Sequence, residues 1–279
     1  MITVQAIHLG PIMLPWGLII LIVAIAVALL IGQYSPYGYR RFKISDTQWA
    51  VFKDTIWTAI LIGLLSARIG FVLFNLDAYL QHPIEIIKIQ DKGFNFYIGL
   101  LAAFLWIFWK NRAVKISFLI ILFSIFTTIT FLGSYIHKQM LLQYQQFPKV
   151  SLTNLQQQKV ELVQFIGKPT VINLWASWCP PCRREMPVLD QAQKTYPNVQ
   201  FVFINQSEDV ATVNAYLQQH TLNLHRVLLD PHGSTAQKTA MYGLPSTLFF
   251  NAQGQLVDSH MGEITHAALD HYVQKIISD

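Results

Sequence analysis

Long apolar runs dominate the first half of the chain. Four of them are long enough for membrane helices, which need about 20 apolar residues, with a range of roughly 17 to 25. We expect these helices near residues 12–31, 55–74, 93–109 and 116–136. The first helix is expected to be retained and not cleaved as a signal peptide, because residues 1–11 contain no Lys or Arg and no credible cleavage site follows the run.

Basic residues set the expected orientation of these helices. They gather in the connection after the first run and in the connection between the third and fourth runs, and the positive-inside rule places both in the cytoplasm. The chain then begins outside, the connection 75–92 lies outside, and the fourth crossing returns the C-terminal half to the outside. The basic residues concerned are Arg40, Arg41, Lys43, Lys110, Arg112 and Lys115.

After residue 150 the pattern changes to short buried strands that alternate with amphipathic helices. Such alternation predicts an α/β layer structure. Residues 251–255 predict a hairpin turn between two strands. The expected strands cover 171–175, 199–204, 227–229 and 247–250, and the expected helices cover 181–196, 208–220, 234–241 and 264–277.

Together these patterns predict a multi-domain chain. We expect an all-α membrane bundle of four transmembrane helices over residues 1–136 and an α/β domain over residues 151–279. Residues 137–150 are rich in Gln and weakly amphipathic, and they are interpreted as a linker between the two domains.

Composition and charge agree with a membrane half. Hydrophobic residues make up 53% of the chain, too many for a wholly soluble protein. Residues 1–139 hold 11 of the 20 Lys and Arg but only 5 of the 15 Asp and Glu, so the net charge of +5 arises there. These basic residues lie in short runs between apolar stretches and form no basic-aromatic surface, so we expect no nucleic-acid partner.

The two cysteines of the chain, Cys179 and Cys182, lie directly after a predicted strand and at the start of a predicted helix. A helix N-terminus stabilises a thiolate at Cys179, whose pKa in such motifs falls from about 8.5 to roughly 3.5 to 7.5. Cys182, one helical turn further on, can then attack the mixed disulfide and release a substrate. Pro181 between them suits a first helical turn, where its missing N–H is no loss.

Two other uses of this pair remain open. A structural disulfide across so short a loop removes little chain entropy. A zinc site would require two more ligands at suitable spacing, whereas there is no second cysteine pair and the nine histidines are scattered. We therefore expect no metal and no cofactor besides the redox-active disulfide of Cys179 and Cys182.

Residues 167–187, GKPTVINLWASWCPPCRREMP, resemble the active-site segment of the TlpA/ResA family. The resemblance covers about half of the chain and implies a thioredoxin-like fold and a thiol-disulfide oxidoreductase, most readily a protein disulfide reductase. Residues 242–247, YGLPST, resemble the cis-proline loop of that family. This implies that Leu244 and Pro245, together with Trp178, shape a groove in which an extended substrate strand pairs with the backbone.

Asn173 marks a departure from thioredoxin, which has a buried aspartate six residues before its first cysteine. Proton transfer to and from Cys182 must then use water or another acid. Glu185, one turn beyond Cys182, is the candidate. The alternative interpretation of Glu185 is a solvated carboxylate in the first turn, favoured there by the helix dipole.

Residues 66–74 and 82–100 resemble the first half of prolipoprotein diacylglyceryl transferase. That family has a histidine followed by two glycines where this chain has Tyr97-Ile98-Gly99, and its later Arg/Asn/Glu-bearing segment has no counterpart here. The transferase reaction is therefore not expected. Arg68 lies inside the second apolar run and is either a functional intramembrane charge or a side chain that snorkels to the interface.

Both cysteines lie outside the apolar runs, so dithiol exchange across the bilayer must be supplied by another protein. The family resemblance implies a DsbD- or CcdA-like transmembrane electron donor. We expect a multi-pass protein of the bacterial cytoplasmic membrane, with its C-terminal domain in the periplasm and with protein thiols, protein disulfides and membrane lipid as partners. The alternatives are a disulfide oxidase resembling DsbA and a lipid-modifying or lipid-binding protein.

Overall fold

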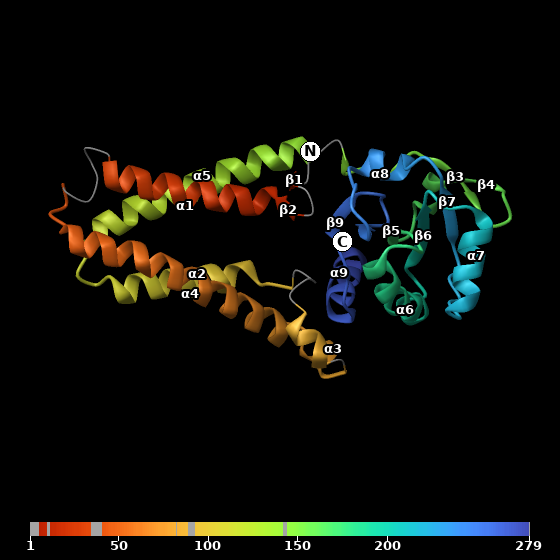
Figure 1. Ribbon diagram of the computed structural model, residues 1–279, viewed down its shortest axis with the longest axis horizontal. Helices are drawn as coiled ribbons and strands as arrows, with labels where there is room; N and C mark the ends of the chain where they lie inside the picture. Colours follow the sequence, from red (N-terminus) through yellow and green to blue (C-terminus); the bar gives the residue numbers. More distant parts are fainter. Residues whose placement is uncertain are drawn as a thin grey trace. The chain divides into compact units, whose positions relative to one another are not determined.

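A computed structural model of the protein describes residues 6–9, 12–34, 41–81, 83–88, 93–141 and 144–278. The chain forms two compact units (Figure 1). The first contains Met1–Phe74 and Gly93–Met140, and the second contains Asn75–Lys92 and Leu141–Asp279. The connection 75–92, expected as a loop of the membrane domain, thus belongs to the second unit.

The first unit is a helical bundle preceded by a short antiparallel hairpin. The hairpin was not expected, because periodicity alone does not distinguish a short apolar strand from the start of an apolar helix. The elements are β1 (Ala6–Leu9), β2 (Ile12–Pro15), α1 (Trp16–Tyr34), α2 (Asp46–Phe74), α4 (Phe96–Lys110) and α5 (Ile116–Leu141).

Among the described residues, three helices are long and apolar enough to cross a membrane: α1, α2 and α5. The fourth expected span is present as α4, but its 15 residues measure about 22 Å, short of a hydrocarbon core of about 30 Å. Asparagines limit this helix at both ends. Asn95 caps its start by accepting from the N–H of Ile98, and Asn111 ends it by donating from its side chain and backbone to Ile107.

Glycines bring α2 and α4 into close contact. A Cβ atom on Gly99 would lie 2.7 Å from the carbonyl oxygen of Gly63 and 2.8 Å from Cβ of Ala67. Further along, Trp106 Nε1 donates to Thr58 Oγ1 at 2.9 Å, so α4 runs antiparallel to α2. Small residues at such a crossing allow the backbones to approach, which is the main source of helix packing in a membrane.

The second unit is built around a seven-stranded mixed sheet in the order β4-β3-β7-β6-β5-β8-β9. Strands β5, β6 and β7 are parallel, and the others pair antiparallel with their neighbours. The elements are α3 (Leu76–Gln81), η1 (Pro83–Ile87), β3 (Ser151–Asn154), β4 (Lys159–Glu161), η4 (Leu162–Phe165), β5 (Thr170–Trp175), α6 (Pro180–Thr195), β6 (Gln200–Gln206), α7 (Val210–Gln219), β7 (Val227–Asp230), α8 (Ser234–Thr239), β8 (Ser246–Phe250), β9 (Leu256–Met261) and α9 (His266–Ser278).

The sheet is covered on both faces, with α6, α7 and α9 on one side and α8 on the other (Figure 1). Successive strand residues point to opposite faces. Val171 and Phe203 therefore pack under the three helices, whereas Ile172 and Ile204 pack under α8 and η4. All six residues of β5 are buried, as expected for a central strand between two layers.

The expected fold class is confirmed, and the expected strands and helices of the second half are present. The linker differs from the prediction, since α5 extends to Leu141 and Phe147 and Val150 are buried in the core of the second unit. The Phe147 ring lies 4.6 Å from that of Phe250, a partner about one hundred residues away that local composition does not reveal. Arg40, His82 and residues 89–92, on which parts of the sequence interpretation rest, lie outside the described residues.

Replacing Gly99 with Ala is expected to destabilise the first unit, although Ala favours a helix over Gly by about 1 kcal/mol. The added methyl group would meet a backbone oxygen that cannot rotate away, and overpacking of this kind costs about 1 to 3 kcal/mol. The matched control is Gly17→Ala in α1, where nothing lies within 4 Å of the added atom. Thermal unfolding of the full chain in detergent should show a lower midpoint for Gly99→Ala alone, and equal midpoints would contradict the close packing of α2 on α4.

Candidate redox site

The turn after β5 carries the cysteine pair to the N-terminus of α6. Cys179 is the N-cap residue, with extended backbone, and its Sγ accepts from the N–H of Cys182 at 3.3 Å. Pro180 and Pro181 are the first two helical residues, where an N–H has no acceptor within the helix. The helix begins one residue earlier than expected, and it places the first sulfur at its positive end.

The pair is joined as a disulfide, with the two Cα atoms 5.3 Å apart. Cys182 is fully buried, whereas Cys179 keeps 3% of its surface exposed and follows Trp178, which is 65% exposed. The exposed indole and the first sulfur therefore form the part of this site that another protein can reach. The second sulfur is reached only from inside the domain.

The loop before β8 lies beside the end of β5. Strand β8 pairs antiparallel with β5, with Ser246 opposite Leu174, so Pro245 lies one strand away from the turn that leads to Cys179. The Leu244–Pro245 peptide bond is cis. Leu244 is partly buried and packs against the hydrophobic clusters on both sides of the sheet. The carbonyl of Pro245 accepts from the N–H of Gly262 at 2.9 Å. The roles of Leu244 and Pro245 in a substrate groove stay predictions.

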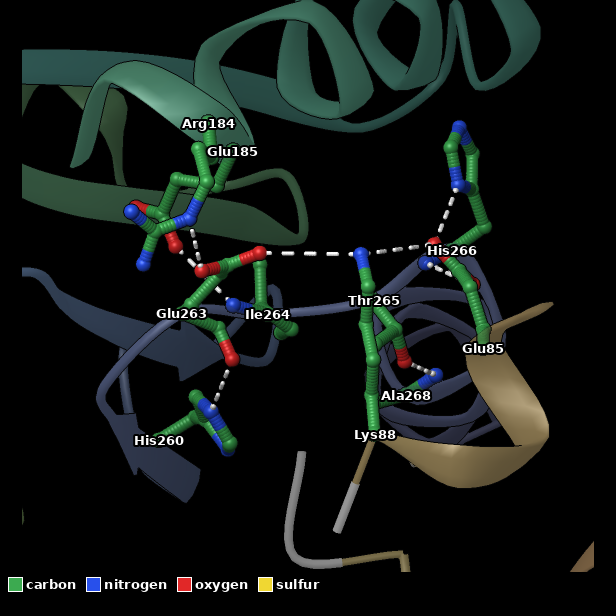
Figure 2. Close-up of polar contacts among 10 residues, drawn as sticks. All are labelled: Glu85, Lys88, Arg184, Glu185, His260, Glu263, Ile264, Thr265, His266 and Ala268. Atoms are coloured by element: carbon green, nitrogen blue, oxygen red, sulfur yellow. Dashed lines mark hydrogen bonds and ion pairs between the residues drawn. The ribbon is translucent and has the colours of Figure 1, made fainter. Parts of the chain in front are cut away.

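Glu185 is buried, so its interpretation as a solvated carboxylate of the first turn is wrong. One carboxylate oxygen accepts from Nδ2 of Asn173 at 2.8 Å. The other accepts from the N–H of Ile264 at 3.0 Å, as Figure 2 shows. The physical reason is helical periodicity. Glu185 follows Cys182 by three residues and therefore shares the inward face of α6, on which Leu189 also lies.

Burial raises the pKa of Glu185 to about 8 from its ordinary 4.5, because the interior disfavours the charged carboxylate. The hydrogen bonds from Ile264 and Asn173 act in the opposite direction, and the negative charge of Glu263 adds to the rise. A carboxyl group with this pKa exchanges a proton near neutral pH, as groups at reactive sites commonly do.

Glu208 fixes the turn before Cys179, and this contact was not predicted from the sequence. It accepts from the backbone N–H of Ser177 at 2.7 Å and from Nδ2 of Asn205 at 2.6 Å, and the Ser177 hydroxyl also donates to it. The parallel pairing that places Trp175 beside Asn205 brings these residues together. An acidic residue just after the end of the next parallel strand was the available signal.

Arg68 lies inside the first unit and is only 8% exposed. Its Nη1 donates to the carbonyl of Gly93 at 2.9 Å, and its guanidinium carbon lies 5.8 Å from the centre of the Phe94 ring. These contacts join α2 to the segment that precedes α4. A further functional role for Arg68 stays a prediction.

Comparisons with known proteins match both halves of the chain. Residues 143–275 match the Redoxin family, and residues 4–138 match the prolipoprotein diacylglyceryl transferase family. The thioredoxin-like protein YneN of Bacillus subtilis is 32% identical over 130 residues, which cover 45% of this chain and 75% of YneN. The C-terminal half belongs to the thioredoxin-like Redoxin family.

Relatives of this Redoxin domain share its chemistry. The thiol-disulfide oxidoreductase ResA of Bacillus cereus is 26% identical over 170 residues, which cover 60% of this chain and 98% of ResA. The protein is accordingly a thiol-disulfide oxidoreductase of the ResA type, as the sequence predicted. A secreted disulfide oxidoreductase of Mycobacterium tuberculosis aligns in structure with a TM-score of 0.42 and 26% identity, covering 46% of this chain and 96% of that protein.

The folding stability of the oxidised protein is expected to fall as the pH rises from about 4.5 to about 8, owing to Glu185. In this window the folded protein keeps a proton that the unfolded chain has lost, so each rise in pH favours unfolding, by up to about 1.4 kcal/mol per pH unit. Denaturant unfolding across this range should show the decline in the wild type and lose this component in Glu185→Gln. Glu161→Gln, at an exposed carboxylate, is the control that should keep it, and an unchanged slope in Glu185→Gln would contradict the assignment.

Proposed function

We propose that this chain is a membrane-anchored protein disulfide reductase whose Redoxin domain lies on the periplasmic side of the cytoplasmic membrane. The observation that carries the proposal is the arrangement of the pair at the start of α6, where Cys179 keeps 3% of its surface exposed next to the exposed Trp178 and Cys182 is fully buried behind it. This arrangement suits a first sulfur that meets the substrate and a second that resolves the intermediate.

In the proposed reaction the reduced pair gives two electrons to a substrate disulfide. The Cys179 thiolate attacks one substrate sulfur, which forms a mixed disulfide and releases the other substrate sulfur as a thiolate. Cys182, as its thiolate, then attacks the sulfur of Cys179, which closes the internal disulfide and releases the second substrate thiolate. The substrate is reduced and the pair is oxidised, with no cofactor besides these two sulfurs.

Glu185 is the proposed proton carrier for Cys182. The buried thiol must lose its proton before it attacks, and a carboxylate one turn further along the same inward face can accept that proton directly or through a water molecule. Its pKa of about 8 leaves both protonation states accessible near neutral pH. Asn173 supports this role, since it is a neutral donor that holds the carboxyl group in place without adding a charge.

The first unit supports the proposed orientation. The segment that follows Arg41 packs against the segment that follows Lys115, with the rings of Phe42 and Phe118 5.3 Å apart, so the two basic connections share one end of the bundle. At the other end, the ring of Trp16 at the start of α1 lies 6.5 Å from that of His137 in α5. With the basic end in the cytoplasm, the chain enters the Redoxin domain on the outside.

The proposed partners follow from this placement. Both cysteines lie in the Redoxin domain, so its electrons must come from a separate transmembrane donor, for which a DsbD- or CcdA-like protein is the proposal. Membrane lipid is the proposed partner of the first unit. An apolar cavity of about 340 Å³ among α1, α2, α4 and α5 supports it, lined in part by Leu21, Phe52, Ala59, Leu100, Leu122 and Phe126.

Replacing Cys182 with Ser is expected to accumulate mixed disulfides between Cys179 and substrate proteins, because the resolving attack is lost. Replacing Cys179 with Ser should trap none, since Cys182 is fully buried. Non-reducing gels of acid-quenched membranes measure the difference, and the double Ser variant is the control for adventitious bands. Equal trapping by both single variants would contradict the assigned order of attack.

The direction and the compartment are tested together by alkylation in intact cells. For a reductase outside the cytoplasm, a membrane-impermeant maleimide should label the wild-type pair mostly as the dithiol. A pair found fully oxidised would favour the disulfide oxidase, and labelling only after cell lysis would contradict the periplasmic placement. A measured reduction potential separates the same alternatives, since thioredoxin lies near about −270 mV and DsbA near about −120 mV.

A further inference from the structure

The short 3-10 helix η1 carries a buried carboxylate into the Redoxin unit. In the sequence η1 belongs to the connection between α2 and α4, yet Glu85 within it is only 6% exposed. One of its oxygens accepts from the backbone N–H of His266 at 3.1 Å, and the other lies 3.1 Å from Nδ1 of the same residue. The carboxylate therefore holds the first residue of α9, at the positive end of that helix.

Lys88 adds a second link from the same connection. Its Nζ lies 3.6 Å from Oε1 of Glu263 and 4.0 Å from Glu85. The other oxygen of Glu263 accepts from Nε of Arg184 at 2.6 Å. An alternating chain of charges thus leads from η1 to Arg184, the residue next to Glu185 in α6 (Figure 2).

Residues 263–266 lie between these contacts and reach the proposed proton carrier. The N–H of Ile264 donates to Glu185 at 3.0 Å. On one side of it Glu263 is held by Lys88 and Arg184, and its carbonyl accepts from Nε2 of His260 at 3.2 Å, which fixes that nitrogen as the protonated one. On the other side His266 is held by Glu85, so the segment is held at both ends (Figure 2).

We propose that Glu85 and Lys88 are positioning residues for the redox site. They hold the segment 263–266 so that the N–H of Ile264 stays on the Glu185 carboxyl group and the charge of Glu263 stays neutralised. This inference rests on the proposed role of Glu185 as the proton carrier for Cys182. It gives the connection between α2 and α4 a positioning role in the Redoxin domain.

Glu85 and Lys88 both act to lower the pKa of Glu185. Its hydrogen bond from Ile264 favours the carboxylate, and the negative charge of Glu263 disfavours it. The side-chain partner of Glu185 is Asn173 from β5, which is neutral. Loss of Glu85 loosens the N–H donor, and loss of Lys88 leaves Glu263 with less compensation, so either change raises the pKa of Glu185.

The test measures the pH dependence of the rate at which the reduced full-length protein, in detergent, reduces oxidised glutathione. Glu85→Ala and Lys88→Gln should move the step that depends on Glu185 upward by about half a pH unit or more. Glu85→Gln keeps an acceptor for the N–H of His266 and should move it less. Asp77→Asn, at an exposed acid in α3 of the same unit, is the matched control and should leave the profile unchanged.

Glu185→Gln separates the two proposals. If the pH step persists in Glu185→Gln, Glu185 is not the proton carrier and the proposed proton path fails. If the step disappears there but keeps its midpoint in both Glu85→Ala and Lys88→Gln, the positioning inference is overturned and the role of Glu185 stands. Thermal unfolding checks that each variant is folded, and Lys88, whose side chain is 43% exposed, provides the answer if Glu85→Ala does not fold.

Discussion

The junction between the end of β5 and the start of α6 is the constraint on which the redox site depends. Because β5 is buried on both faces, the turn that leaves it has little freedom. The two strands that pair with β5 complete the site. Glu208, which follows β6, binds the turn at Ser177, and the cis-proline loop that precedes β8 lies beside the end of β5. Strand β5 leads directly into α6, so the sulfur of Cys179 lies at the positive N-terminus of that helix. The sulfur of Cys182, in the first turn of the helix, is fully buried.

A neutral donor and a buried acid occupy the interior behind the pair. Burying a carboxylate is unfavourable unless hydrogen bonds replace its water, and here Asn173 and the N–H of Ile264 supply them. Because Asn173 carries no charge, the acid keeps a pKa within reach of neutral pH and avoids the coupling of two neighbouring carboxylates. Asn173 and Glu185 therefore form one hydrogen-bonded pair, with the acid on the helix and its amide partner on the strand.

The two family matches meet within one chain, and the division into compact units does not coincide with them. The transferase-like match extends over residues 4–138, yet the part of it from Asn75 to Lys92 belongs to the Redoxin unit by its contacts. The family matches and the compact units differ because the compact units are defined by contacts, whereas the family matches follow the sequence. Glu85 and Lys88 illustrate this difference. They belong to the transferase-like match, yet their side chains contact His266 and Glu263 of the Redoxin match.

Local sequence patterns were enough to predict the apolar runs, the α/β alternation, and a cysteine pair between a strand and a helix that begins with proline. The contacts between distant elements could be known only from the folded structure. The hydrogen bonds of Glu208 to Ser177, of Glu185 to Ile264 and of Glu85 to His266 join residues that are 31, 79 and 181 positions apart. Helical and strand periodicity tell which face of an element is apolar, but strand order and register decide which polar group from a distant element meets a buried charge.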